Sequence, residues 1–271
     1  MCRVSPYTLH STLYTKMDLV SIITPAYNSE RFIAETIMSV QNQTYQNWEM
    51  IVVDDCSTDK TAEIILSIQK KDARIRYIRN ESNRGAAFSR NIALQNAKGK
   101  WIAFLDSDDI WHPEKLERQI GFMIKNNYHF SYTNYCEIDE HSKETGILVS
   151  GIKVIDKNKM RCYCWPGCLT VMYDTEFVGL MQTVDININE EYALWIEIAK
   201  KTNCYLLDEN LAKYRRHSNS LTSKSYFSLI KWHYLMFRKL DNNIISSLFL
   251  TLGNLVFGAY KKIVYRKSYK L

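Results

Sequence analysis

Short apolar runs alternate with helical patterns through the first half of the chain, and this alternation constrains the fold more than any other feature. The predicted strands are the runs LVSIITPA, WEMIVVDD, RIRYIR and WIAFLD. Helical patterns follow them at about residues 30–43, 58–71, 84–97 and 113–126. Strands that alternate with helices over short connections form βαβ units around a mostly parallel sheet. The sequence therefore predicts an α/β fold with a Rossmann-like central sheet flanked by helices.

Polar clusters follow three of these strands directly, as TPAYN, DDCSTD and DSDD. In open α/β sheets ligands bind at the carboxyl ends of the strands, so the clusters are expected to meet on one rim. Carboxylates as close as Asp106 and Asp108 must be solvated, hydrogen-bonded or neutralised by a cation. A divalent ion that also holds a diphosphate would suit them, and acids that favour the start of helix 113–126 are the alternative.

Two other classes fit these strand ends poorly. A dinucleotide-dependent dehydrogenase would carry GxGxxG after the first strand, where this chain has AYNSER. A receiver domain would place its acidic pair after the first strand, whereas Asp54 and Asp55 end the second. With 46% hydrophobic and 24% charged residues, the composition is that of a folded globular protein.

Several separate motifs, in the right order, resemble family 2 glycosyltransferases of the GT-A fold. They are TPAYNSERFIAETIMSVQNQTYQNWEMIVVDDCSTDKT, NESNRGAAFSRNIALQNAKGKWIAFLDSDDIWHPEKL and NEEYALW, and the resemblance covers about residues 19–220. The later segments PGCLTVMYD and LAKYRRHSNSLTS are similar to bacterial enzymes that build O-antigen, capsule or exopolysaccharide units. The resemblance implies an inverting transfer from a nucleotide-sugar donor, usually a UDP-sugar, to a lipid-linked or other glycan acceptor.

The resemblance also assigns roles to individual residues. Those matched to the nucleotide-sugar site are Pro25, Ala26, Tyr27, Asn28, Asp55, Arg90, Asp106 and Ser107. Within this set, Asp55 matches the acid that contacts the base, and Asp106 matches the acid on the ribose side. Asp108 matches the ligand of a divalent metal, Mn²⁺ or Mg²⁺, and His217 is a candidate further ligand with a structural role as the alternative.

The predicted catalytic base lies in the pair Glu190-Glu191, at the start of a helix. Direct displacement at the anomeric carbon needs a base that takes the proton of the attacking hydroxyl. In the resemblance Glu191 holds the position usually occupied by Asp, so we expect Glu191 to be the base, with Glu190 as the second candidate. The longer side chain moves the carboxylate by roughly an ångström, and acids that favour the helix dipole are the alternative. Trp195, in the same helix, is expected either in the core or beside the acceptor.

Three segments are predicted. Residues 1–16 form a disordered leader, unless Met17 is the initiator; residues 17–220 form the GT-A domain; and residues 221–271 form a basic, helical extension. The GT-A domain divides into a nucleotide-binding half, about 17–110, and an acceptor half, about 111–220.

The apolar and basic end of the extension leaves two interpretations open. Lys and Arg without any acid follow a stretch that contains Phe249, Leu250, Leu255, Val256 and Phe257. Such a helix suits peripheral docking on anionic lipid, and a helix packed on the core is the alternative. The stretch is too short and too polar to indicate a membrane span.

The cysteines and the N-terminus indicate a cytoplasmic protein, placed at the inner face of the membrane by its acceptor. The start has no apolar signal region, and seven Cys, an odd number, favour reduced thiols. Cys162, Cys164 and Cys168 lack the CxxC pairs of a zinc site and are expected to be buried thiols.

A nucleic-acid partner is not expected. The alternatives are a non-catalytic nucleotide-sugar or glycan-binding protein and a sugar nucleotidyltransferase, which would need a Gly-rich phosphate loop in place of TPAYNSE.

Overall fold

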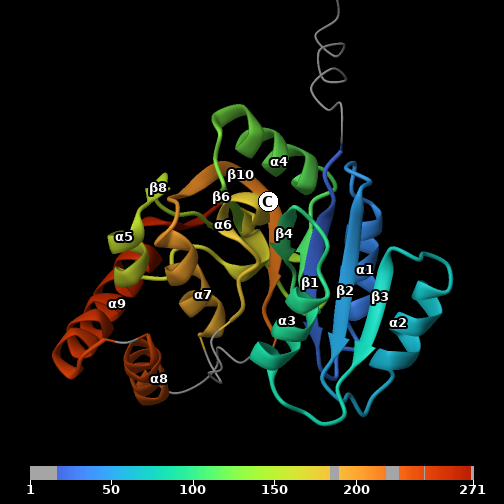
Figure 1. Cartoon of the computed structure of the whole chain (residues 1–271), viewed down its shortest axis with the longest axis horizontal. Coiled ribbons are helices and arrows are strands. Elements are labelled where there is room, and N and C mark those ends of the chain that lie inside the picture. Colours follow the sequence, from blue (N-terminus) through green and yellow to red (C-terminus); the bar gives the residue numbers. More distant parts are fainter. Residues whose placement is uncertain (1–16, 184–188, 218–225, 241, 270–271) are drawn as a thin grey trace, which may run out of the picture.

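The computed structural model describes residues 17–183, 189–217, 226–240 and 242–269. In these residues one sheet is flanked by helices (Figure 1). Its strands are β1 (Val20–Ala26), β2 (Trp48–Asp54), β3 (Ile75–Arg79), β4 (Trp101–Phe104), β5 (Ile110–Trp111), β6 (Phe130–Ile138), β7 (Glu144–Val149), β8 (Val154–Ile155), β9 (Met172–Asp174), β10 (Cys204–Arg215) and β11 (Arg266–Ser268). The helices are α1 (Ile33–Gln41), α2 (Thr61–Gln69), α3 (Ala86–Gln95), α4 (Lys115–Asn126), α5 (Lys157–Cys162), the 3₁₀ helix η2 (Cys168–Thr170), α6 (Thr175–Val178), α7 (Glu190–Ala199), α8 (Tyr226–Lys239) and α9 (Ile244–Val264).

The sheet is parallel in its first half and mixed in its second. The strand order is β11-β7-β6-β9-β4-β1-β2-β3, with β10 beside β5, β6 and β8. The pairs β1–β2, β1–β4 and β2–β3 are parallel, as the strand–helix alternation predicts. The pairs β4–β9, β6–β9 and β6–β7 are antiparallel, and β6 and β7 form a hairpin. The predicted mostly parallel α/β sheet is thus confirmed.

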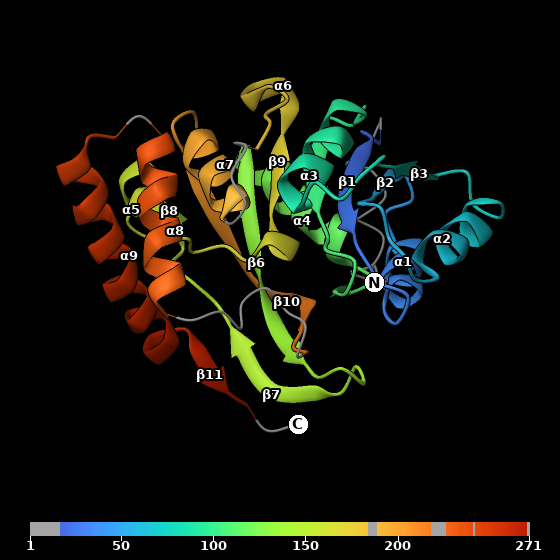
Figure 2. The same cartoon turned by 90° about the horizontal axis from the view of Figure 1, so that it is seen from below.

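Successive residues of each inner strand supply two separate hydrophobic layers. Ile23 and Ile51 point to the face covered by α3 and α7, where they join one buried cluster with Leu94. Ile22 and Met50 point to the face covered by α1 and α4, where they join a second cluster. Figure 2 shows α3 and α1 on opposite sides of β1 and β2. Strands buried on both faces need continuous apolar sequence, which explains why a run such as MIVV in β2 does not alternate strictly.

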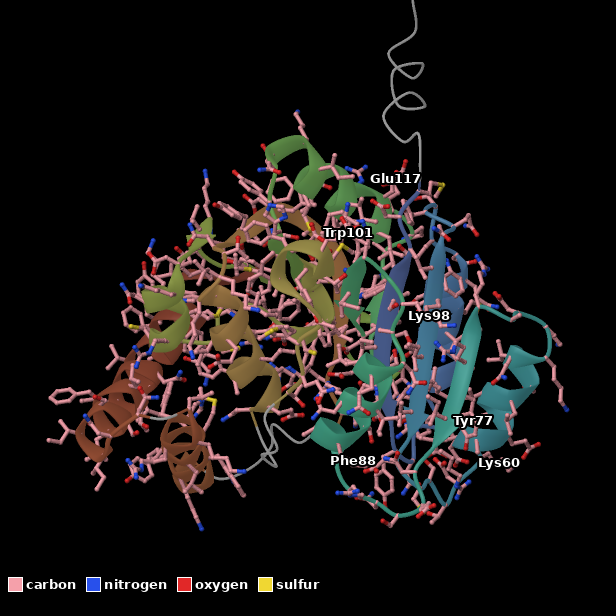
Figure 3. The ribbon with its side chains drawn as sticks, viewed as in Figure 1. Lys60, Tyr77, Phe88, Lys98, Trp101 and Glu117 are labelled. Atoms are coloured by element: carbon pink, nitrogen blue, oxygen red, sulfur yellow. The ribbon has the colours of Figure 1, made fainter. Side chains whose placement is uncertain are left out.

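The parallel strands all end at the same edge of the sheet. Trp101, the first residue of β4, and Phe88, in the first turn of α3, lie at opposite edges (Figure 3). The connections that follow β1, β2, β3 and β4 therefore gather at the edge near Phe88, which is where the polar clusters were expected.

Trp195 belongs to the core. Its side chain is 1% exposed and packs edge-on against Phe104, with ring centroids 4.9 Å apart. The core interpretation is confirmed, and a place beside the acceptor is excluded by this burial.

Some local predictions were wrong. The predicted helix at 113–126 begins at Lys115, so Pro113 lies before the helix and not at its first position. The C-terminal helices α8 and α9 are present, but the final strand β11, which pairs antiparallel with β7, was not predicted. The predicted leader at 1–16 lies outside the described residues.

Candidate active site

The loops after β1 and β2 are tied together by side-chain to backbone hydrogen bonds. Asn28 has a left-handed backbone, with φ of 47°. Its N–H donates to the Ser57 hydroxyl at 3.0 Å, and its side-chain oxygen accepts from the Thr58 N–H at 2.9 Å. The Ser29 N–H donates to the Thr61 hydroxyl at 2.7 Å. These bonds join the two loops, which are distant in sequence, into one continuous surface.

The predicted nucleotide loop divides into buried and open residues. Pro25 and Ala26 are buried within β1, and the Ala26 carbonyl accepts from the Asp55 N–H at 2.8 Å. Tyr27 and Asn28 follow them and are exposed, with half of the Tyr27 surface open to solvent. Only Tyr27 and Asn28 therefore present side chains to a ligand, while Pro25 and Ala26 set the course of the backbone.

Asp55 holds the connection that follows β3. The carboxylate is 3% exposed and accepts from the Asn80 amide at 2.7 Å, the Arg84 N–H at 2.9 Å and the Gly85 N–H at 2.7 Å. Gly85 has φ of 88°, a conformation that favours glycine. A carboxylate has about four acceptor positions, so about one remains for the N–H of a nucleotide base.

Arg90 joins the end of β4 to the start of α7. Its buried guanidinium donates to Asp106 at 2.6 Å, forms an ion pair with Glu191 at 3.1 Å and donates to Glu190. These acids oppose the effect of burial and raise the pKa of Arg90 well above its usual range. The predicted donor-side residues Arg90 and Asp106 and the predicted bases are thus brought into one ion-pair cluster, which we call the Arg90 cluster (Arg90, Asp106, Glu190, Glu191).

The two glutamates of this cluster differ in access. The Glu190 side chain is 6% exposed, whereas that of Glu191 is 25% exposed. Burial and the neighbouring Glu191 charge raise the pKa of Glu190 to about 7, against the opposing effect of Arg90. Of the pair, Glu191 is the carboxylate that is more open to solvent.

Asp108 and His217 lie side by side on the other side of the DSDD turn. The His217 Nε2 atom is 2.8 Å from the Asp108 carboxylate, and the Phe32 ring packs against His217 with centroids 5.2 Å apart. Burial and the Asp106 charge raise the pKa of Asp108, although His217 opposes the shift. Ser107, between the two acids, shares a 2.7 Å hydrogen bond with the Ser29 hydroxyl and fixes the turn to the β1 loop.

Asp109 leaves one buried oxygen without a partner among the described residues. Its Oδ1 accepts from the Arg215 N–H at 2.9 Å, and its Oδ2 has no hydrogen bond. Burial and the charges of Asp108 and Asp106 raise its pKa well above the usual range. Three carboxyl groups thus lie within four residues, and one of their buried oxygens has no hydrogen-bond partner among the described residues. Carboxylate oxygen and imidazole nitrogen are both ligands for Mn²⁺, so Asp108 and His217 fit a divalent ion.

Sequence reasoning missed Cys168, whereas the resemblance had placed Arg215, with His217, near the donor phosphates. The Cys168 Sγ lies within 4.8 Å of the carboxylates of Asp106 and Glu191, and burial raises the pKa of this thiol well above its usual range. A protonated thiol is a poor ligand for a hard ion, and Arg90 already neutralises both acids. Arg215 is buried and donates to the Asp108 carbonyl at 2.7 Å and to Glu35 at 2.6 Å. No sequence pattern marks Cys168, while Arg215 stands in the motif that contains His217.

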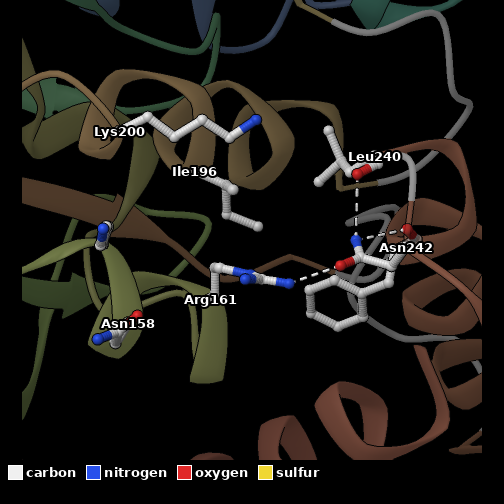
Figure 4. A pocket seen from close by; sticks show the side chains of 8 residues that line it. Asn158, Arg161, Ile196, Lys200, Leu240 and Asn242 are labelled. Atoms are coloured by element: carbon white, nitrogen blue, oxygen red, sulfur yellow. Dashed lines mark hydrogen bonds between the residues drawn. The ribbon is translucent and has the colours of Figure 1, made fainter. Parts of the chain in front are cut away.

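A cavity of about 350 Å³ lies apart from these residues, between α5, α7 and the end of α8 (Figure 4). Lys157, Arg161 and Lys200 line it together with apolar side chains, and Arg161 donates to the Asn242 oxygen at 2.5 Å. It meets α7 at Ile196 and Lys200, whereas the Arg90 cluster is at the opposite end of that helix. The cavity is therefore separate from the candidate active site.

The comparisons with known proteins agree with this arrangement. The profile of glycosyl transferase family 2 matches residues 21–175. The UDP-Glc:alpha-D-GlcNAc-diphosphoundecaprenol beta-1,3-glucosyltransferase WfgD of Escherichia coli is 40% identical over 245 residues, which cover 90% of this chain and 94% of WfgD.

Two solved structures share the fold. Staphylococcus aureus TarS in complex with UDP-GlcNAc superposes with a TM-score of 0.66 at 20% identity, over 85% of this chain and 69% of TarS. The mannosyltransferase PcManGT of Pyrobaculum calidifontis, in complex with GDP-Man and Mn²⁺, superposes with a TM-score of 0.60 at 16% identity, over 91% of this chain and 76% of PcManGT. The chain belongs to glycosyl transferase family 2, with the GT-A fold that its sequence predicted.

Proposed function

We propose that this glycosyltransferase moves a sugar from a UDP-sugar to a lipid-linked acceptor, with inversion and with a divalent metal. The observation that carries the proposal is the Arg90 cluster, in which one guanidinium joins Asp106, on the expected ribose side, to Glu191, the expected base. A direct displacement needs the donor sugar and the acceptor hydroxyl to meet between such groups. The names of the similar proteins support the substrate classes, since WfgD is named for UDP-Glc and a diphosphoundecaprenol-linked GlcNAc, and TarS was solved with UDP-GlcNAc.

In the proposed reaction the acceptor oxygen attacks the anomeric carbon from the face opposite the diphosphate. The bond from that carbon to the diphosphate oxygen breaks, its electron pair leaves with UDP, and the configuration inverts. Glu191 takes the proton of the acceptor hydroxyl, because its carboxylate is the more open of the pair. Buried Glu190 holds the Arg90 guanidinium in place.

The metal part of the proposal rests on Asp108 and His217. These side chains lie 2.8 Å apart and would hold Mn²⁺ or Mg²⁺. When bound, the ion would neutralise charge on the departing diphosphate. The Mn²⁺ complex of PcManGT, a protein of the same fold, supports this choice of ion.

A lipid-linked acceptor would place the protein at the cytoplasmic face of a membrane.

A non-catalytic nucleotide-sugar-binding protein is the second candidate, and one observation favours it. The Arg90 guanidinium lies 3.1 Å from Glu191, and a nearby positive charge weakens a carboxylate as a base. Binding and turnover must therefore be measured separately.

The test measures nucleotide binding by thermal shift and sugar transfer to a diphosphate-linked lipid acceptor. UDP with Mn²⁺ at one hundred times its dissociation constant should stabilise the wild type by about 2.7 kcal/mol, and Asp108→Asn should lose most of this gain. Glu191→Gln should keep the stabilisation and lose transfer by at least about a hundredfold. Glu197→Gln, on the same helix but away from the cluster, is the matched control and should retain both.

Each outcome has a distinct meaning. Nucleotide binding without transfer in the wild type, with a range of UDP-sugars and acceptors, would favour the binding protein. No stabilisation by any nucleotide would overturn the donor site itself.

A further inference from the structure

Helix α9 buries polar residues and exposes apolar ones, which is the reverse of an ordinary surface helix. Its buried residues are Ser247, Thr251, Asn254 and Lys261, which fall on one face at helical spacing. The Asn254 amide donates to the Tyr192 hydroxyl at 2.9 Å, and the Lys261 ammonium donates to the Trp165 carbonyl at 2.6 Å. Polar groups therefore attach α9 to the rest of the protein, together with the apolar contacts of Leu250 and Phe257.

The opposite face of α9 is apolar and open. Its exposed large apolar side chains are Ile244, Ile245, Leu248, Phe249, Leu252, Leu255, Val256, Tyr260 and Ile263, whereas Phe257 packs against Trp165. Phe249 is 71% exposed and Ile263 is 81% exposed. Leu250, which the sequence grouped with this face, packs inward against the core instead. We call these exposed residues the outer face of α9.

This face is too large to be an ordinary scatter of surface apolar residues. In both Figure 1 and Figure 2, α9 lies at the end of the molecule opposite α2, with no described element on its far side. A contiguous exposed apolar patch on this scale marks an interaction surface. The helix has 21 residues, so the outer face is about 31 Å long.

The basic residues around α9 indicate which kind of partner its outer face binds. From Asn242 to Leu271 the sequence contains Lys and Arg but no Asp or Glu. Lys262 and Lys267 are exposed beside the last turns of the helix, and Arg238 is exposed at the end of α8. A second copy of this chain would bring two such basic segments together, which is unfavourable, whereas an anionic lipid surface complements them.

We propose that the outer face of α9 docks in the interface of a bilayer that contains anionic phospholipid, with the helix parallel to the membrane plane. By length and composition α9 could also cross a membrane, so the prediction that this stretch is too short and too polar for a span was wrong. A crossing helix would have to give up the bonds of Asn254 and Lys261 to Tyr192 and Trp165, whereas a helix lying in the interface keeps them. The inference does not depend on the transfer reaction, because it follows from the face and its charges alone.

The test is flotation of the purified full chain with vesicles of phosphatidylcholine alone, or of equal parts phosphatidylcholine and phosphatidylglycerol. We expect binding to the mixed vesicles that weakens as salt is added. Phe249→Glu combined with Leu252→Glu should reduce the vesicle partition coefficient by at least about tenfold, because two apolar contacts become charges. The control is Met38→Glu combined with Leu66→Glu, which alters exposed apolar residues of α1 and α2 and should leave binding unchanged.

Three results would overturn the proposal, two of them in the vesicle assay and one in sedimentation. The first is that the wild type binds neither vesicle, and the second is that the Phe249 and Leu252 variant binds as well as the wild type. The third is a concentration-dependent dimer in sedimentation, abolished by the same two substitutions, which would assign the face to a second copy. The UDP-induced thermal shift, measured on the variant, shows that the fold and the donor site are intact.

Discussion

At the scale of single residues, Arg90 is the residue on which the charge balance of the candidate site most depends. It is buried at 3% exposure and neutralises acids from two different elements, Asp106 after β4 and the glutamate pair of α7. A buried ion pair contributes little net stability when compared with apolar residues, but removing one partner leaves the other charge uncompensated. The cluster is therefore sensitive to any substitution that changes its charge balance.

We expect Arg90→Met to lower the free energy of unfolding by about 3–5 kcal/mol, because buried Glu190 loses its cation. Adding Glu190→Gln should recover part of this loss, since the uncompensated charge is then removed. Urea unfolding of the single and double variants measures both values. Arg118→Met, which breaks only exposed ion pairs with Glu114 and Glu209, should change stability by less than about 1 kcal/mol. Equal losses in the single and double variants would contradict the explanation.

At the scale of elements, the sequence predicted the edge of the sheet where the strands end, but it did not predict which side chains contact one another there. Apolar runs and polar clusters indicated β1 to β4 and the rim where they end, because strand burial and helix periodicity are local properties of the sequence. Arg90 could be matched to a nucleotide site, but its bonds to Glu190 and Glu191 link residues 100 positions apart. The same limit applies to Cys168, which reaches the site only through the turn at η2.

The short final strand illustrates a different limit. The segment Arg266–Ser268 has no apolar alternation, and all three residues are exposed. It is a strand because β7 offers an open edge for backbone pairing, from Val149 to Ile147. Edge pairing uses the backbone groups of both strands, so side-chain patterns carry little information about it.

Asp55 provides the prediction for this scale, since it connects the end of β2 to the segment before α3. Asn at this position would place its N–H₂ group either against the Gly85 N–H, with the loss of one hydrogen bond, or against the Arg84 N–H and the Asn80 amide, with the loss of two. We expect Asp55→Asn to cost about 1–3 kcal/mol of stability and to weaken UDP binding. Hydrogen exchange should show faster exchange of the Arg84 and Gly85 amides, with no change at Met172 in β9. Unchanged exchange at both amides would show that Asp55 does not hold this segment.

At the scale of the whole molecule, one buried carboxylate joins the C-terminal strand to the main sheet. Glu137 of β6 accepts from Arg216, after β10, at 2.9 Å and from Arg266 of β11 at 2.9 Å. Burial alone would raise the pKa of Glu137, but the hydrogen bonds from Arg266 and Arg216 more than offset it and hold the pKa below its usual value. A lowered pKa in the folded state means that the stabilisation is present above the unfolded pKa, near 4.3, and is lost as the pH falls through the folded value.

We therefore expect Glu137→Gln to destabilise the protein by about 1–3 kcal/mol at neutral pH, and by progressively less as the pH falls below about 4. Urea unfolding across this pH range provides the measurement, and amide exchange in β11 should rise in the variant. Glu140→Gln, which breaks an exposed pair with Arg31, should change stability much less than Glu137→Gln does. A penalty that stays constant down to the lowest pH would exclude this role for the charge.

The hydrogen bond between Asn254 and Tyr192 has a consequence for which acceptors can be used. Tyr192 follows Glu191 directly in α7, so the helix proposed to lie on the lipid surface and the helix that carries the proposed base are fixed to each other. With α9 in the interface, the height of the Glu191 carboxylate above the membrane would then be constant. A hydroxyl close to the lipid diphosphate and one at the end of a long glycan lie at different heights, so the protein would select acceptors by the length of the chain already built.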